Sequence, residues 1–236
     1  GGIGLVPQGR CNFPALSVAE NLRLGLPMGL AILVEVTGFA FMAIFIARLG
    51  TTPVAGHPFA VNLVSMLFMM PLALGNATST LVAQRIGAGD ARDARRLGWH
   101  GLLIGCIVAA AMSSAVFAAR HPVLALYTHE ATVIAAALPL VAWMTVFHVA
   151  DAAQTIAAFV LRAYKITTAP VLIYVAALWG VGLAGGYVLA FNLSGFTPTF
   201  LLGAPGFWMA STTGLTLAAA LLTAYLAWVL KQKLAG

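Results

Sequence analysis

Charged residues are the main shortage in this sequence. Asp, Glu, Lys and Arg make up 8% of its 236 residues, and residues 166–230 contain none of them. Soluble domains carry about a quarter charged residues, so a shortage on this scale excludes an ordinary soluble fold. The mean hydropathy of +0.98 agrees with this exclusion. The sequence therefore predicts an all-α, polytopic membrane protein.

Motifs of catalytic and metal sites are missing as well. The pair His129-Glu130 lacks the second His of a zinc HExxH helix, and the chain has neither a GxSxG elbow nor a P-loop. The five His residues show no metal-ligand spacing. Basic loops beside membrane helices account for the net charge of +6 without a nucleic-acid partner. We therefore expect no enzyme, no resident metal and no cofactor.

Long apolar runs are present instead. A membrane helix needs about 20 apolar residues to cross a hydrocarbon core of roughly 30 Å. Six runs of this kind occur, at about residues 24–47, 57–85, 98–119, 131–161, 169–191 and 205–230. The predicted organisation is a cytoplasmic leader or linker over residues 1–23, a six-helix transmembrane lobe over 24–231, and a cytoplasmic tail over 232–236.

Lys and Arg residues are distributed unequally between the two predicted sides of the membrane. One side carries only Arg48 and Arg120. The other side carries ten, namely Arg10, Arg23, Arg85, Arg92, Arg95, Arg96, Arg162, Lys165, Lys231 and Lys233. Because cytoplasmic loops of membrane proteins are enriched in Lys and Arg, this distribution predicts cytoplasmic termini in a multi-pass protein of the cell (inner) membrane.

Two acidic residues lie inside predicted spans, Glu35 in the first and Asp151 in the fourth. A carboxylate in the bilayer interior costs about 2.5–3.5 kcal/mol on insertion scales, so it faces protein or a wet cavity. The spans contain no Lys or Arg that could neutralise these acids. We therefore expect a mobile cation, H+ or Na+, as their partner. The alternative is that each acid is permanently protonated and holds two helices together by a hydrogen bond.

Asp151 has polar neighbours on its own helix face. His148 lies three residues before it, and Gln154 and Thr155 follow at three and four residues. Side chains at these intervals share one face of a helix, so the four form a polar stripe that predicts a pocket.

A second polar stripe runs along the second span. Its members recur every three or four residues and are Asn62, Ser65, Met69, Leu72, Asn76, Thr80 and Ala83. One interpretation is helix packing through small and polar residues. The other is the wall of a substrate cavity, in which Met adapts to several ligands. The pattern leaves both interpretations open.

Four blocks of sequence resemble the C-terminal half of NorM-type transporters of the MATE (multidrug and toxic compound extrusion) family. The blocks are PMGLAILVEVTGFAFMAIFIARLGTTPVAGH, NLVSMLFMMPLALGNATSTLVAQRIGAGD, VADAAQTIAAFVLRAYKIT and GFWMASTTGLTLAAALLTAYL. The resemblance implies that this chain is one six-helix lobe of a twelve-helix antiporter. Its partners would be the lipid bilayer, an N-terminal six-helix lobe of the same transporter and small organic, drug-like substrates.

The resemblance also implies a cation site at Glu35 and Asp151. The family often has Tyr one turn before this Asp, whereas this sequence has Phe147, and the missing hydroxyl group favours H+ over Na+. The expected function is cation-coupled multidrug export by alternating access. The rival hypotheses are a six-helix channel, a small homodimerising transporter of an unrelated family, and an intramembrane enzyme with His148 and Thr155 as its base and nucleophile.

Overall fold

The computed structural model describes residues 17–235, and within this range it contains helices and no strands. The all-α prediction is therefore confirmed. The long helices are α1 (Val18–Ala47), α2 (Thr51–Gly87), α3 (Ala91–Ala118), α5 (Ala131–Ala163) and α8 (Ala204–Ala235). The shorter ones are α4 (Arg120–Ala125), α6 (Thr168–Tyr174), η1 (Val175–Ala184), α7 (Gly185–Ala190) and η2 (Thr199–Leu201).

Six helical segments are long and apolar enough to cross a membrane within the described range. The long helices provide five of these segments. The remaining one, which lies between α5 and α8 in the chain, is the continuous run α6–η1–α7. Their number and order match the six apolar runs of the sequence. The chain is a multi-pass membrane protein.

Several helices begin earlier or end later than hydropathy predicts. Helix α1 starts at Val18 instead of residue 24, because Ser17 and Glu20 form a capping box in which each side chain bonds the other's backbone N–H. Helix α3 starts at Ala91 instead of residue 98, where the Asp90 side chain accepts from the Asp93 N–H at 2.9 Å. Helices α2 and α8 also extend beyond their predicted ends. Polar caps and charged turns lengthen a helix without contributing to its apolar run.

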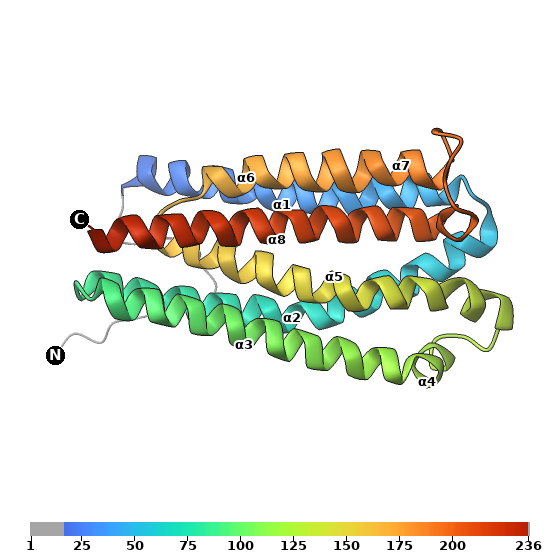
Figure 1. The fold of residues 1–236 in the computed structure, drawn as a ribbon, viewed down its shortest axis with the longest axis horizontal. Helices are drawn as coiled ribbons and strands as arrows, with labels where there is room; N and C mark the ends of the chain where they lie inside the picture. Colours follow the sequence, from blue (N-terminus) through green and yellow to red (C-terminus); the bar gives the residue numbers. More distant parts are fainter. Residues whose placement is uncertain (1–16, 236) are drawn as a thin grey trace.

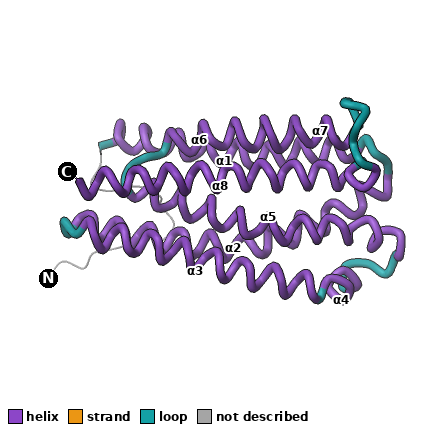
Figure 2. Tube along the Cα trace, in the orientation of Figure 1, coloured by secondary structure: helices purple, strands orange, loops and turns teal. Residues whose placement is uncertain are grey.

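Helix α5 lies at the centre of the bundle and has the most continuously buried surface. It packs against α2, α3 and α8, while α1 packs mainly against α6 and η1 (Figure 1). Figure 2 shows that the connections gather at the two ends of the bundle. This arrangement leaves α1 and α2 with little direct contact, so a space can open between them in front of α5.

Helix α3 approaches its neighbours through glycine. A methyl group added at Gly101 would overlap Thr78 of α2, and one added at Gly105 would overlap Ile156 of α5. Small residues let helix backbones come close together, which is how helices associate in a membrane without a hydrophobic driving force between them. The close packing of α3 fixes α2 and α5 relative to each other.

The described basic residues near the helix ends separate as the sequence predicts. The start of α1, the α2–α3 turn, the α5–α6 connection and the end of α8 lie at one end of the bundle (Figure 1). The α1–α2 turn and α4, which carry Arg48 and Arg120, lie at the opposite end. Arg10, the remaining residue of the basic set, lies outside the described range.

Candidate functional site

A cavity of about 570 Å³ lies between α1, α2, α5 and α6. Its wall is mainly apolar and aromatic, with Phe39, Phe68, Phe147 and Phe159 among the lining residues. Both predicted acids, Glu35 and Asp151, line it as well, although they are far apart in the sequence. A mostly apolar pocket with a few convergent polar groups is the usual form of a small-molecule site.

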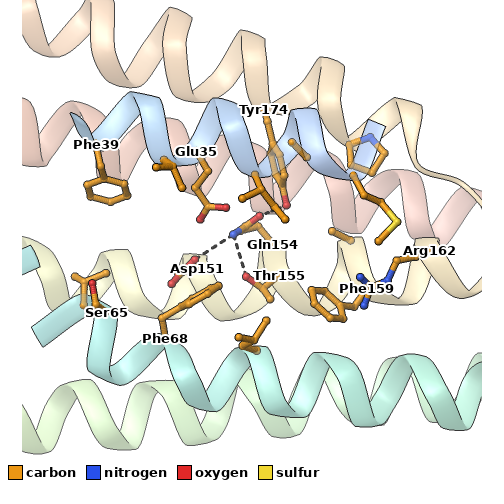
Figure 3. Close-up of a pocket in the computed structure, with 18 of the residues that line it drawn as sticks. Glu35, Phe39, Ser65, Phe68, Asp151, Gln154, Thr155, Phe159, Arg162 and Tyr174 are labelled. Atoms are coloured by element: carbon orange, nitrogen blue, oxygen red, sulfur yellow. Dashed lines mark hydrogen bonds between the residues drawn. The ribbon is translucent and has the colours of Figure 1, made fainter. Parts of the chain in front are cut away.

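Asp151 belongs to a hydrogen-bonded network that joins α5 to α6. The side chain of Gln154 donates from Nε2 to Asp151 Oδ1 and to Thr155 Oγ1, both at 3.0 Å. The hydroxyl of Tyr174, on α6, donates to Gln154 Oε1. All four side chains are at most 5% exposed. The network holds the carboxyl group of Asp151 in a fixed position at the cavity wall (Figure 3).

Glu35 reaches the cavity from the opposite helix. It lies on α1, and its carboxyl group and that of Asp151 project into the space between α1 and α5 (Figure 3). No described side chain forms a hydrogen bond or an ion pair with Glu35, and the ion pair identified in the described range, Arg85–Asp93, belongs to the α2–α3 turn. Two acids thus share a cavity without a pairing base.

The turn of α1 that carries Glu35 is tied to the π-helical segment η1. The indole Nε1 of Trp179 donates to the carbonyl oxygen of Val34 at 3.0 Å. The same indole covers Gly38, where an added Cβ atom would lie 3.8 Å from Nε1. Segment η1 is a ten-residue π-helix, and such helices are often found at functional sites. Trp179 therefore helps to set the position of Glu35.

Phe147 lines the cavity one turn before Asp151 and is 4% exposed. It packs edge-to-face against Phe39 at 5.8 Å between ring centroids and against Trp208 at 5.9 Å. The phenol hydroxyl in the Asp151 network is that of Tyr174, which comes from α6 and not from α5. This second helix supplies the phenol that the sequence lacks at position 147.

The predicted stripe on α2 divides into two groups. Ser65 and Met69 line the cavity, whereas Asn62 and Asn76 are not among its lining residues. Asn62 accepts a long bond of 3.5 Å from the hydroxyl of Tyr127. Asn76 donates to the carbonyl oxygen of its own helix at Leu72, at 2.9 Å. The structure thus brings only the middle of the stripe to the cavity.

His148 does not line the cavity, although it belongs to the predicted polar stripe on α5. It is completely buried, and neither ring nitrogen has a hydrogen-bond partner among the described residues. The Thr155 hydroxyl group instead contacts Gln154. The base and nucleophile suggested for an intramembrane enzyme are therefore not paired.

Arg162 stands near the end of α5 and also lines the cavity. Its guanidinium group lies 3.8 Å from the ring centroid of Phe159 and donates to Asn76 Oδ1 at 3.3 Å. It lies 11 residues beyond Asp151, which is about 16 Å along a helix, and the ion pair identified among the described residues involves neither acid.

Sequence reasoning missed three residues of this site, namely Tyr174, Trp179 and Arg162. The two aromatic residues occur in an apolar run where Tyr and Trp are ordinary, and the signal for their role is the helix that packs against them. The sequence predicts Arg162 in a cytoplasmic loop, whereas α5 extends to Ala163 and brings it to the cavity wall.

The chain matches known proteins in sequence. The MatE family model matches residues 27–188. The chain is 39% identical over 215 residues to the "Probable multidrug resistance protein NorM" of Chromobacterium violaceum, covering 90% of this chain and 45% of the relative. It is 38% identical over 222 residues to the multidrug resistance protein MdtK of Pectobacterium atrosepticum, covering 93% of this chain and 48% of the relative. The chain thus spans about half the length of the curated relatives it matches.

The fold also matches solved structures. A crystal structure of the Vibrio cholerae MATE transporter VcmN in the bent form superposes with a TM-score of 0.81 at 22% identity, covering 90% of this chain and 47% of that one. MATE proteins are transporters and not enzymes, and the matched portion is the C-terminal half of the NorM and MdtK relatives. The fold, the length of the family match and the identity to these relatives agree that the chain belongs to the MatE family.

Proposed function

We propose that this chain is the C-terminal lobe of a multidrug antiporter that exports small organic, often cationic, compounds in exchange for H+ or Na+. Support comes from the names of its relatives, which are multidrug resistance proteins, and from its match to half of their length. An N-terminal six-helix lobe would complete the transporter. Membership of the MatE family argues against the hypothesis of a homodimerising transporter from an unrelated family.

The observation that carries this proposal is the placement of Glu35 and Asp151 on opposite walls of one cavity, without a base to pair with either. Ionised carboxyl groups in a low-dielectric interior require a neutralising partner. Carboxyl, amide and hydroxyl oxygens are the ligands that hard cations prefer, and these acids, Gln154 and Thr155 supply them. Protonation of the carboxyl groups meets the same requirement.

Cation binding would change the preferred packing of the lobe. With the cation bound, Glu35 and Asp151 no longer repel each other, and α1 can approach α5. After release, the like charges favour separation of the two helices. A ligand shifts such an equilibrium only through different affinities for the two states, so drug and cation would compete through this cavity. The aromatic wall suits planar and cationic substrates.

The experiment for this proposal uses the complete transporter in proteoliposomes loaded with a fluorescent organic cation. We expect export when an inward gradient of H+ or of Na+ is imposed, and the gradient that drives export identifies the coupling ion. An ion current that continues without any substrate would support the rival channel hypothesis and contradict coupled transport.

The orientation is part of the proposal, with both ends of the chain in the cytoplasm of a cell whose inner membrane it spans. It rests on the separation of basic residues between the two ends of the bundle. In a cysteine-free background, Cys introduced at Ser194 should react with a membrane-impermeant thiol reagent in intact cells. Cys at Ala88, which is also exposed, should not react. The reverse pattern would contradict the orientation.

A further inference from the structure

His148 presents an unsatisfied polar group at the centre of the lobe. The side chain is 0% exposed, and both Nδ1 and Nε2 lack a hydrogen-bond partner among the described residues. A neutral imidazole ring has one N–H donor and one acceptor nitrogen, so both functions are unused. Buried polar groups are nearly always paired, and an exception requires an explanation.

A second buried histidine shows that this fold can satisfy such a ring. His57, on α2, is 5% exposed, and its Nδ1 accepts a hydrogen bond from Trp208 Nε1 at 3.3 Å. The two histidines have similar burial and differ in their partners. The missing partner of His148 is therefore a property of its position and not of buried histidines in this lobe.

A second lobe cannot supply the missing partner. His148 is fully covered by side chains of this lobe alone, so a domain docking on the surface would make no contact with it. The partner has to come from inside the lobe after a side chain moves. Among the buried polar side chains, Asp151 on the same helix and Ser113 on α3, which packs against α5, are the candidates for this partner.

Asp151 is the better placed of the two. It lies three residues after His148 on α5, and residues at this interval are neighbours on a helix surface. Helical side chains lean toward the N-terminus, which directs Asp151 back over the turn that carries His148. In the structure, Asp151 Oδ1 accepts from Gln154, while Oδ2 has no hydrogen bond to a described residue. One carboxyl oxygen is therefore available for a second donor.

We propose that His148 is a positioning residue that donates an N–H to Asp151 whenever the coupling cation has left. The inference rests on the proposed function, because it requires Asp151 to bind that cation. In the structure, Gln154 holds Asp151 toward the cavity, and in this proposal that arrangement is the one adopted with the cation bound. After release, the carboxylate loses its neutralising charge, and the neutral His148 N–H replaces the cation as its partner. Cation and imidazole thus compete for one carboxyl group, and His148 itself gains and loses no proton.

The test compares His148→Leu, His148→Gln and Ser113→Ala in the complete transporter in proteoliposomes. Loss of the N–H destabilises only the cation-free state, so His148→Leu should lower the half-saturating concentration of the coupling cation about tenfold and slow maximal turnover. Gln keeps an N–H donor and should restore much of both values. Ser113→Ala should leave both unchanged; a shift like that of His148→Leu would make Ser113 the partner and overturn the proposal.

A purely structural histidine predicts a different result. His148→Leu removes two unsatisfied polar atoms from the interior, so it should then leave both kinetic constants unchanged and keep or raise thermal stability. That outcome would overturn the proposal. Should the Leu variant fail to reach the membrane, 15N spectra of labelled histidine can replace it, with His148→Gln identifying the signal. A His148 signal that does not move between cation-free and cation-saturated protein would also overturn it.

The Asp151→Asn variant separates this proposal from the proposed function. An active Asp151→Asn transporter with unchanged coupling would contradict the cation site itself. An inactive Asp151→Asn transporter together with normal kinetics in His148→Leu would contradict only the role of His148.

Discussion

Two helices of this lobe, α5 and α2, carry polar side chains at intervals of three or four residues and use them differently. On α5, Asp151, Gln154 and Thr155 are buried and bond to one another, and Tyr174 extends their network to a second helix. On α2, the exposed side chains of Ser65, Asn76 and Thr80 each donate to the backbone of their own helix. The same sequence periodicity thus gives a tertiary site in one case and local bonds in the other.

The difference identifies the interactions on which function should depend. A side chain that bonds its own helix backbone can be removed with little consequence, because that backbone carbonyl keeps its helical partner. A buried side chain that joins a network leaves its partners unsatisfied when it is removed. Substitutions on α5 should therefore have much larger effects than substitutions on α2, and the following predictions test this comparison.

The largest effects are expected at the two acids. Glu35→Gln and Asp151→Asn each preserve size and hydrogen-bonding capacity but remove the ionisable charge. Each should reduce drug export by the complete transporter to the background level, with normal amounts of protein in the membrane. Resistance assays in cells together with quantitative immunoblots provide the measurement. Wild-type resistance in both variants would show that the acids are protonated helix contacts and not a cation site.

These two acids were predictable from the sequence because a carboxylate within an apolar span is a rare and strong signal. The six spans were predictable for a similar reason, since a run of about 20 apolar residues is hard to produce by chance. Helix packing, however, decides which of the polar residues line the cavity. Because of this packing, Asn62 and Asn76 do not line the cavity. His148, predicted on the same polar stripe as Asp151, is buried and does not line it either.

Tyr174 and Trp179 illustrate the limit of sequence reasoning more directly. Each is one aromatic residue in an apolar run, and aromatic residues are common on surfaces that face lipid. Their roles depend on Gln154 and Val34, which are contributed by other helices. Nothing within residues 168–190 specifies these partners, so no local pattern could reveal them.

The next largest effect is expected at Tyr174. The Tyr174→Phe substitution removes the hydroxyl that holds Gln154, and Gln154 in turn positions Asp151. Loss of a bond in a buried, charged network should weaken the apparent affinity for the coupling cation about tenfold. Transport rates over a series of cation concentrations measure this. Tyr225→Phe on α8 is the matched control, since Tyr225 stacks on Trp228 and is not among the cavity-lining residues. Equal effects in both variants would point to general destabilisation.

A smaller effect is expected at Trp179, which acts on Glu35 through the backbone. Trp179→Phe keeps a ring against Gly38 and removes the bond to the Val34 carbonyl. A neutral hydrogen bond contributes about 0.5–1.5 kcal/mol, and because this one acts on Glu35 only through the backbone, the apparent cation affinity should fall by the low end of that range, roughly twofold to threefold. Trp228→Phe, at an exposed position of α8, should leave the affinity unchanged. An unchanged cation affinity in Trp179→Phe would show that the hydrogen bond from η1 to α1 does not position Glu35.

The smallest effects are expected on α2. Ser65→Ala and Thr80→Ala each remove a hydroxyl that bonds a carbonyl one turn earlier on α2, at 2.9 Å in both cases. Such bonds contribute little to helix stability, so export of each drug should stay within about twofold of wild type. The pair is informative because Ser65 lines the cavity and Thr80 does not. Export measured with several drugs of different shape compares the two positions directly. A drug-dependent loss in Ser65→Ala, with no loss in Thr80→Ala, would show that substrate competes for the Ser65 hydroxyl. In that case α2 would form part of the binding surface, and its contrast with α5 would hold for the cation but not for the drug.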